Sequence, residues 1–222
     1  MSMNFYALRL SPFEIAGVKR KPASASSMIH AATMSGMSAH FGGAGAKVPK
    51  LLLNLELLEQ AGGNGQLASP ALRELLARQI EQAKSPAPAG RGTDPRRLLD
   101  LHKSWHVLHY LFTGDADAGR PPADALLGGR ELGEDMGYGP SRLHEPEATA
   151  DFARFLAPLT ADTLRRRIDF GRMSSLGIYC CGDEDDGSAE ELVDDVDHYF
   201  PLLQSFAAEA ASDGNGMLVW LS

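Results

Sequence analysis

Residues 3–10 read MNFYALRL and residues 216–221 read GMLVWL, and these two segments decide the fold. In the first segment apolar and mixed positions alternate, with Phe5, Ala7 and Arg9 on one side of the chain. The second segment is a short apolar run that directly follows the turn-forming sequence Asp-Gly-Asn. Both patterns are typical of β-strands. We therefore expect the two ends of the chain to be strands and neighbours in one sheet.

Helical patterns dominate the middle of the chain. Leucines recur at helical spacing in 49–60, and the Ser-Pro and Asp-Pro pairs at 69–70 and 94–95 are typical of helix starts. Ser188 with Glu191 three residues later forms a capping-box pattern. These signals predict helices at 49–60, 70–84, 95–112, 146–157, 161–168 and 189–211.

Strands at the ends and helices between them indicate an α+β fold. We expect a single domain over residues 1–222, in which a small sheet that includes both terminal strands packs against several helices. Residues 18–47 have no sustained periodicity and end in a glycine-rich stretch. That composition predicts a flexible or partner-ordered segment.

The overall composition, 44% apolar and 23% charged, is that of a globular chain. The chain has no run of 18 apolar residues, so no membrane span is predicted. The first residues lack the apolar core of a signal peptide. The two cysteines, Cys180 and Cys181, are adjacent, which disfavours a disulfide bond between them. We expect a reduced, cytoplasmic protein that does not contact membranes.

Charge is distributed unevenly along the chain. Residues 1–111 carry 13 Lys and Arg against 7 Asp and Glu, a net charge of +6, whereas residues 112–222 carry 8 against 22, a net charge of −14. Binding to phosphate requires clustered cations, so the acidic half argues against nucleic acid as a partner. It suits a basic protein partner.

Segment 99–114, LDLHKSWHVLHYLFTG, carries three histidines. On a helix His102, His106 and His109 share one face, and two histidines four residues apart can bind a metal if a carboxylate completes the site. However, no glutamate lies between the histidines, and apolar residues such as Trp105 fill much of the segment. Packed, hydrogen-bonded histidines are the favoured interpretation, and no metal is predicted.

The next distinctive segment, 125–142, reads ALLGGRELGEDMGYGPSR and is rich in glycine. Its glycines predict a loop with positive φ angles, and it lacks the ending of a phosphate-binding loop. Glu134 and Asp135 could act as acid and base or as metal ligands. Local hydrogen bonds from these carboxylates to the backbone of a turn are the favoured alternative.

Nine carboxylates lie within residues 183–197. Their spacing matches only a fragment of a calcium-binding loop. Carboxylates at the start of a helix interact favourably with its dipole, and they could equally form a docking surface for a basic protein. The residues of this predicted acidic surface are Asp183, Glu184, Asp185, Asp186, Glu190, Glu191, Asp194 and Asp195.

Five strings occur in a characteristic order: MSMNFYALRL, DLHKSWHVLHYLFTGD, ALLGGRELGEDMGYGPSRL, LTADTLRRRIDFGRMSSLGIY and GMLVWLS. Together they resemble the YfbM-like family of bacterial proteins, a domain of unknown function. The resemblance covers about the first fifteen residues and nearly everything after residue 93, and it implies an α+β domain with both ends in the sheet. Two departures stand out, an insertion at about 19–92 and Cys180-Cys181 where members tend to have proline. Because no reaction is established for the family, no catalytic residue is carried over.

We expect a non-enzymatic binding protein, most concretely an immunity-type inhibitor that neutralises a bacterial toxin through its acidic surface. The alternative is an enzyme or small-ligand-binding domain, and a third possibility is a scaffold subunit without separate activity. No cofactor is predicted. The alternative places a pocket at Trp105, His106, His109, Glu134, Asp135 and Tyr138.

Overall fold

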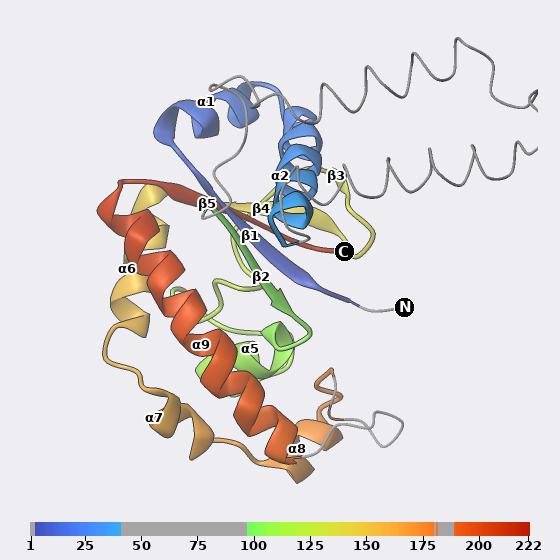
Figure 1. Ribbon diagram of the computed structural model, residues 1–222, viewed down its shortest axis with the longest axis vertical. Coiled ribbons are helices and arrows are strands. Elements are labelled where there is room, and N and C mark those ends of the chain that lie inside the picture. Colours follow the sequence, from blue (N-terminus) through green and yellow to red (C-terminus); the bar gives the residue numbers. More distant parts are fainter. Residues whose placement is uncertain (1–2, 41–96, 180, 182–188) are drawn as a thin grey trace, which may run out of the picture. The chain divides into compact units, whose positions relative to one another are not determined.

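The computed structural model describes residues 3–40, 97–179, 181 and 189–222 (Figure 1). Contacts between residues divide the chain into two compact units, residues 1–30 with 96–222, and residues 31–95. The predicted helices at 49–60 and 70–84 lie outside the described residues.

A five-stranded antiparallel sheet forms the centre of this unit, with strand order β2-β1-β5-β4-β3. The two terminal strands are neighbours, and residue pairs such as Tyr6 with Trp220 and Leu8 with Leu218 lie opposite each other. The rings of Tyr6 and Trp220 stack with their centroids 5.4 Å apart. The prediction that both ends lie in one sheet is therefore confirmed. The strands are β1 (Phe5–Leu10), β2 (Leu98–His102), β3 (Arg130–Asp135), β4 (Pro140–His144) and β5 (Gly216–Leu221).

Strand β2 corrects the prediction of one helix over 95–112. Leu99 and Leu101 are buried in the main core, and the polar residues Asp100 and His102 alternate with them along the chain. The strand pairs with β1 and forms one edge of the sheet. His102 has a positive φ of 49° at the end of the strand. The helix begins only at Trp105 because pairing with a remote strand overrides the local helical signal.

Strands β3 and β4 correct the prediction of a loop over 125–142. They form a hairpin in which Leu132 and Leu143 are buried. Gly133 has a φ of +81° where the register of the pair is irregular, and Gly137 and Gly139 have positive φ in the connecting turn. The glycines therefore shape a bulge and a tight turn between two strands.

Two helices follow β1, so the described part of 18–47 is mostly helical, where the sequence predicts a flexible or partner-ordered segment. They are α1 (Pro12–Arg20) and α2 (Ser24–His40). Ser11 and Glu14 form a complete capping box at the start of α1. In the sequence this motif is visible only as Ser-Pro-x-Glu. Alanine, serine and methionine are compatible with a helix even where their periodicity is weak.

The remaining helices confirm the predictions for 146–157, 161–168 and 189–211 and add one short helix. They are α5 (Trp105–Thr113), α6 (Pro146–Leu156), α7 (Ala161–Arg165), α8 (Phe170–Ser175) and α9 (Ala189–Ser212). The predicted cap at Ser188 lies outside the described residues. Among the described residues no helix is long and apolar enough to cross a membrane.

The helices cover both faces of the sheet (Figure 1). On one face α5, α6 and α9 enclose the main core together with Phe5 and Ala7 of β1 and Met217 and Val219 of β5. Leu8, which follows Ala7 in β1, is also buried. Its side chain points to the opposite face of the sheet, where α1 packs on β1. Strands β1 and β5 are thus buried on both faces of the sheet, and α5 lies inside the main core.

Candidate functional site

His106 on α5 is held by two hydrogen bonds from different loops. Its Nδ1 accepts a hydrogen bond from the backbone N–H of Tyr179 over 2.9 Å, so the ring proton lies on Nε2, which donates to the carbonyl of Ala116 over 2.9 Å. The ring stacks on Trp105 with centroids 4.6 Å apart. Burial lowers the pKa of His106, although the Ala116 carbonyl and the Asp117 carboxylate act in the opposite direction. His106 therefore acts as a neutral bridge between two loops.

His109, one turn further along α5, is fully buried. Neither of its ring nitrogens has a close, well-aligned hydrogen-bond partner within the described part of the chain, although the backbone of Ala118 acts to raise its pKa. Burial and the neighbouring His106 lower the pKa of His109, while Asp124 and Asp115 oppose the shift. Leaving a buried polar atom unpaired costs about 1–3 kcal/mol.

His144, at the end of β4, shares these properties. It is 7% exposed, and its Nε2 has no hydrogen-bond partner among the residues that the structure describes. Burial lowers the pKa of His144, the carboxylate of Asp124 and nearby backbone groups oppose this, and Arg142 reinforces it. Because His144 lies opposite Met217, a residue of the main core, its side chain enters the same layer as α5.

The carboxylate of Asp124 acts to raise the pKa of both His109 and His144. Asp124 lies in the connection between α5 and β3, close to two glycines. A Cβ on Gly119 would lie 2.6 Å from the Cβ of Asp124, and a Cβ on Gly128 would lie 3.1 Å from its Cγ.

The expectation that His102, His106 and His109 share one helix face is wrong. His102 lies at the end of β2 and outside α5, so the three histidines do not share a helix face. Within residues 3–40, 97–179, 181 and 189–222, no group of three histidine, cysteine or acidic side chains is arranged to hold a metal ion.

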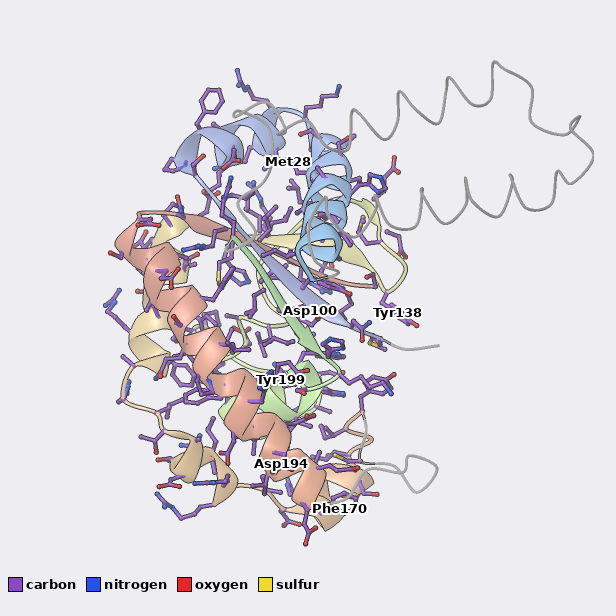
Figure 2. All side chains as sticks on the ribbon, viewed as in Figure 1. Met28, Asp100, Tyr138, Phe170, Asp194 and Tyr199 are labelled. Carbon is purple, nitrogen blue, oxygen red and sulfur yellow. The ribbon has the colours of Figure 1, made fainter. Side chains whose placement is uncertain are left out.

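The hairpin turn does not join the histidines. Asp135 accepts hydrogen bonds through Oδ1 from the backbone N–H groups of Gly137 and Gly139 over 2.7 and 3.0 Å, as expected for a carboxylate that caps a turn. Glu134 is exposed, and Met136 lies 3.8 Å from the Ser26 hydroxyl of α2. Figure 2 places Tyr138 in this turn, away from α9.

The predicted acidic surface is described in part, since Asp183, Glu184, Asp185 and Asp186 lie outside the described residues. Glu190, Glu191 and Asp194 are exposed on the first turns of α9. Asp195 is engaged internally, because its Oδ2 accepts a hydrogen bond from the Ser104 hydroxyl over 2.7 Å.

Acidic character continues from α9 to the edge of the sheet. Burial raises the pKa of Tyr199, and the carboxylates of Asp195 and Asp100 raise it further. The pKa of Tyr6 is raised by burial and by the same Asp100. Figure 2 shows Asp194, Tyr199 and Asp100 one above another in this view. The tyrosines therefore lie in a negative potential that extends over β2.

The chain was compared with known proteins. A family model described as a domain of unknown function, DUF1877, matches residues 1–220. The chain belongs to the DUF1877 family. The resemblance to YfbM-like proteins, inferred from the five sequence strings, is thereby confirmed.

One solved structure similar to this DUF1877 protein is the crystal structure of YfbM from Escherichia coli, a protein of unknown function. It is 23% identical, with a TM-score of 0.43, and the similarity covers 57% of this chain and 83% of that one. None of the curated proteins matches the chain.

Sequence reasoning missed several residues of this DUF1877 domain. Asp124 and His144 carry no motif of their own, and only the neighbouring glycine pair at 128–129 indicates a close approach. The sequence pattern did not point to Asp100, because this residue was expected in a helix and lies in β2. It did not point to Tyr199, because this residue lies in α9 beyond the acidic run.

Proposed function

We propose that this DUF1877 protein is a non-enzymatic binding protein, an immunity-type inhibitor that neutralises a bacterial toxin by docking its acidic surface on a basic protein face. The observation that supports it most directly is the state of Glu190 and Asp194. Both are exposed on the first turns of α9, and neither makes an ion pair or hydrogen bond with another described residue. Their charges are available to a partner.

Other carboxylates of α9 have internal roles that orient these two. Asp195 is bonded to Ser104, and Asp197 forms an ion pair with Arg165 over 2.8 Å. The first contact ties the start of α9 to the turn before α5, and the second ties it to α7. The exposed charges therefore project from a fixed helix, which lowers the ordering cost of association.

The electrostatic mechanism makes a kinetic prediction. Unscreened carboxylates steer a basic partner toward the surface, so the association rate falls as salt is added while the dissociation rate changes less. The favourable interaction of Glu190 and Glu191 with the dipole of α9 is compatible with this role, because both residues remain exposed.

The experiment has two steps. The tagged full chain is first used to capture proteins from its native host at low salt, and the captured protein is identified by mass spectrometry and purified. Association rates are then measured for the double variant Glu190→Gln/Asp194→Asn and for Glu147→Gln/Asp151→Asn on α6, which changes the net charge equally. We expect the first variant to associate about tenfold more slowly and the second to behave as the wild type.

Two results contradict the proposal. One is that no basic protein is retained at low salt. The other is that both double variants lose association rate to the same extent, since this would trace the effect to net charge and not to the acidic surface.

The pocket alternative finds less support. Both ring nitrogens of His106 and the Oδ1 of Asp135 are engaged in hydrogen bonds with backbone groups. Met136, in the turn that holds Tyr138, contacts Ser26 of α2.

A further inference from the structure

A carboxylate, an imidazole and a phenol ring lie together where the end of β2 meets α9, and Figure 2 labels two of them, Asp100 and Tyr199. Nε2 of His102 lies 3.7 Å from Oδ2 of Asp100, and the ring centroids of His102 and Tyr199 are 6.1 Å apart. His102 therefore links the carboxylate to the phenol ring, across two elements that are remote in sequence. We call Asp100, His102 and Tyr199 the β2–α9 corner.

Helix α9 is tied to the turn after β2 at a point one helical turn before Tyr199. Asp195 accepts a hydrogen bond from the buried hydroxyl of Ser104 over 2.7 Å, and residues four apart on a helix share one face. The ring of Tyr199 also meets the ring of His198 edge-on, with centroids 4.7 Å apart. The Tyr199 ring is therefore held in place before any partner binds, which lowers the ordering cost of association.

The carboxylate of Asp100 is oriented by the backbone and keeps one oxygen for a ligand. Its Oδ1 accepts a hydrogen bond from the backbone N–H of His102 over 2.8 Å. Its Oδ2 lies beyond hydrogen-bond distance of the His102 ring and can accept hydrogen bonds from outside. The side chains of Asp100 and His102 are 37% and 56% exposed, and Tyr199 is half-buried. The corner can therefore be reached from solvent.

A carboxylate beside an aromatic ring distinguishes between the two common cations of proteins. A guanidinium group is planar, so it can donate to a carboxylate and also stack on an aromatic face. The ammonium group of lysine is a compact, strongly hydrated charge that gains mainly from the carboxylate. The chain itself contains a contact of the first kind, since the guanidinium carbon of Arg9 lies 5.7 Å from the ring centroid of Phe206.

The surface next to Tyr199 also suits the aliphatic part of an arginine side chain. Leu202 follows Tyr199 by three residues on α9, so the two side chains lie on the same side of the helix. Leu202 is 45% exposed, and it is one of three large apolar side chains that are exposed within the described part of the chain. The methylene groups of an arginine can pack on such a surface while the charged end reaches Asp100.

We propose that the β2–α9 corner is an arginine-binding site, in which a guanidinium group of a partner protein pairs with Oδ2 of Asp100 and stacks on the ring of Tyr199. The inference rests on the proposed function for the nature of the partner, a basic protein, and it names the side chain that the partner contributes. Glu190 and Asp194 attract the partner, and the corner holds one of its arginines.

The test uses two fluorescently labelled peptides of equal charge, tetra-arginine amide and tetra-lysine amide, and the intact chain at low salt. Fluorescence anisotropy gives the two dissociation constants, and we expect the arginine peptide to bind about fivefold more tightly. Tyr199→Phe keeps the ring and should keep this preference, whereas Tyr199→Leu should reduce it to less than about twofold. Asp100→Asn should weaken binding of the arginine peptide by about fivefold.

Two control variants separate the corner from general effects of charge and aromatic surface. Glu147→Gln removes one exposed carboxylate from α6, and Phe13→Leu removes an aromatic ring that is 81% exposed on α1. Both variants should leave the preference for arginine unchanged. A preference that is lost equally in Tyr199→Leu and Phe13→Leu would overturn the proposal.

A second measurement applies even if Tyr199→Leu does not fold. The backbone amide resonances of residues 100–102 and 199 in the wild type should shift on addition of tetra-arginine, and they should shift less with tetra-lysine. The proposal is overturned if the wild type binds both peptides equally, if Tyr199→Leu keeps the preference, or if these resonances do not move. Because both peptides are synthetic, any of these failures leaves the test of Glu190 and Asp194 with the captured partner unaffected. Failure to capture a basic protein would overturn the proposed function and leave the preference for arginine measurable.

Discussion

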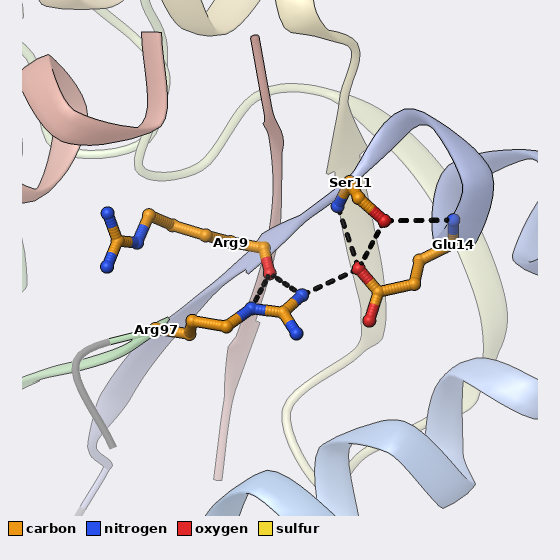
Figure 3. Close-up of polar contacts among 4 residues, drawn as sticks. All are labelled: Arg9, Ser11, Glu14 and Arg97. Atoms are coloured by element: carbon orange, nitrogen blue, oxygen red, sulfur yellow. Dashed lines mark hydrogen bonds and ion pairs between the residues drawn. The ribbon is translucent and has the colours of Figure 1, made fainter. Parts of the chain in front are cut away.

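Arg97 donates a hydrogen bond from Nη2 to Oε2 of Glu14 over 2.6 Å, and its Nε donates to the carbonyl of Arg9 over 3.1 Å (Figure 3). The same Glu14 oxygen accepts hydrogen bonds from the backbone and the hydroxyl of Ser11. The capping box of α1 is therefore also the clamp that holds the chain as it enters β2. One carboxylate stabilises both a helix start and the edge of the sheet.

Replacing Glu14 with glutamine should lower the free energy of unfolding at pH 7 by about 1–2 kcal/mol. Burial acts to raise the pKa of Glu14, but hydrogen bonds from Arg97 and Ser11 outweigh it and lower the pKa below 4.5. The stabilisation is therefore present above pH 4.5 and is lost as the pH falls through the folded-state pKa. Urea unfolding at several pH values should show the wild type converging on the variant in acid.

Glu147→Gln provides the control for this prediction, because Glu147 is an exposed first-turn carboxylate of α6. It should change stability by no more than about 0.5 kcal/mol. A difference between wild type and Glu14→Gln that stays constant down to pH 3 would show that the charge of Glu14 is not what stabilises the clamp.

Replacing His106 with phenylalanine should keep the stacking on Trp105 but leave the Tyr179 N–H and the Ala116 carbonyl without their partner. We expect a loss of about 1–3 kcal/mol in the free energy of unfolding, because two half-buried backbone groups become unpaired. Chemical denaturation measures it, with His198→Phe on the exposed side of α9 as the matched substitution. Equal losses in the two variants would disprove the bridging role of His106.

How much the sequence predicts depends on where the stabilising partner of a segment lies. Helix α9 and strands β1 and β5 carry their own periodicity, so their prediction needed no knowledge of the fold. Leu99 and Leu101 satisfy a helical pattern as well as a strand pattern, and only pairing with β1 decides between them. That partner is about ninety residues away in the chain.

The candidate sites follow the same rule. The acidic surface is a contiguous run, so its members could be named from the sequence, as could the capping role of Asp135. The burial of His144 could not be predicted, because His144 lies opposite the core residue Met217 only after β4 pairs with β5. Such a position is a product of tertiary structure and leaves no local spacing in the sequence.

Replacing Gly129 with alanine tests the close fit between the connection and His144. The new Cβ would meet Nε2 of His144 at 2.9 Å and the residue has a φ of +103°, so strain and overlap add. Gly137→Ala is the matched variant, because Gly137 has a φ of +117° but nothing within 4 Å. We expect Gly137→Ala to lose about 1–2 kcal/mol and Gly129→Ala at least about 1 kcal/mol more, measured by thermal unfolding. Similar losses of stability in the two variants would mean that the His144 side chain moves away from the new Cβ without a measurable cost.

The stability of the whole domain should decrease as the pH falls from 7.5 to 5. Burial lowers the pKa of His106, His109 and His144 in the folded state below the ordinary value of 6.5. In that interval the unfolded chain binds more protons than the folded one, so the free energy of unfolding falls with decreasing pH and becomes level above about pH 7. Urea midpoints at pH 7.5, 6.5 and 5.5 report the slope, which should decrease in His109→Gln and remain unchanged in His198→Gln. A midpoint that rises toward pH 5.5 would require these buried imidazoles to bind protons more tightly in the folded state, contrary to their desolvation.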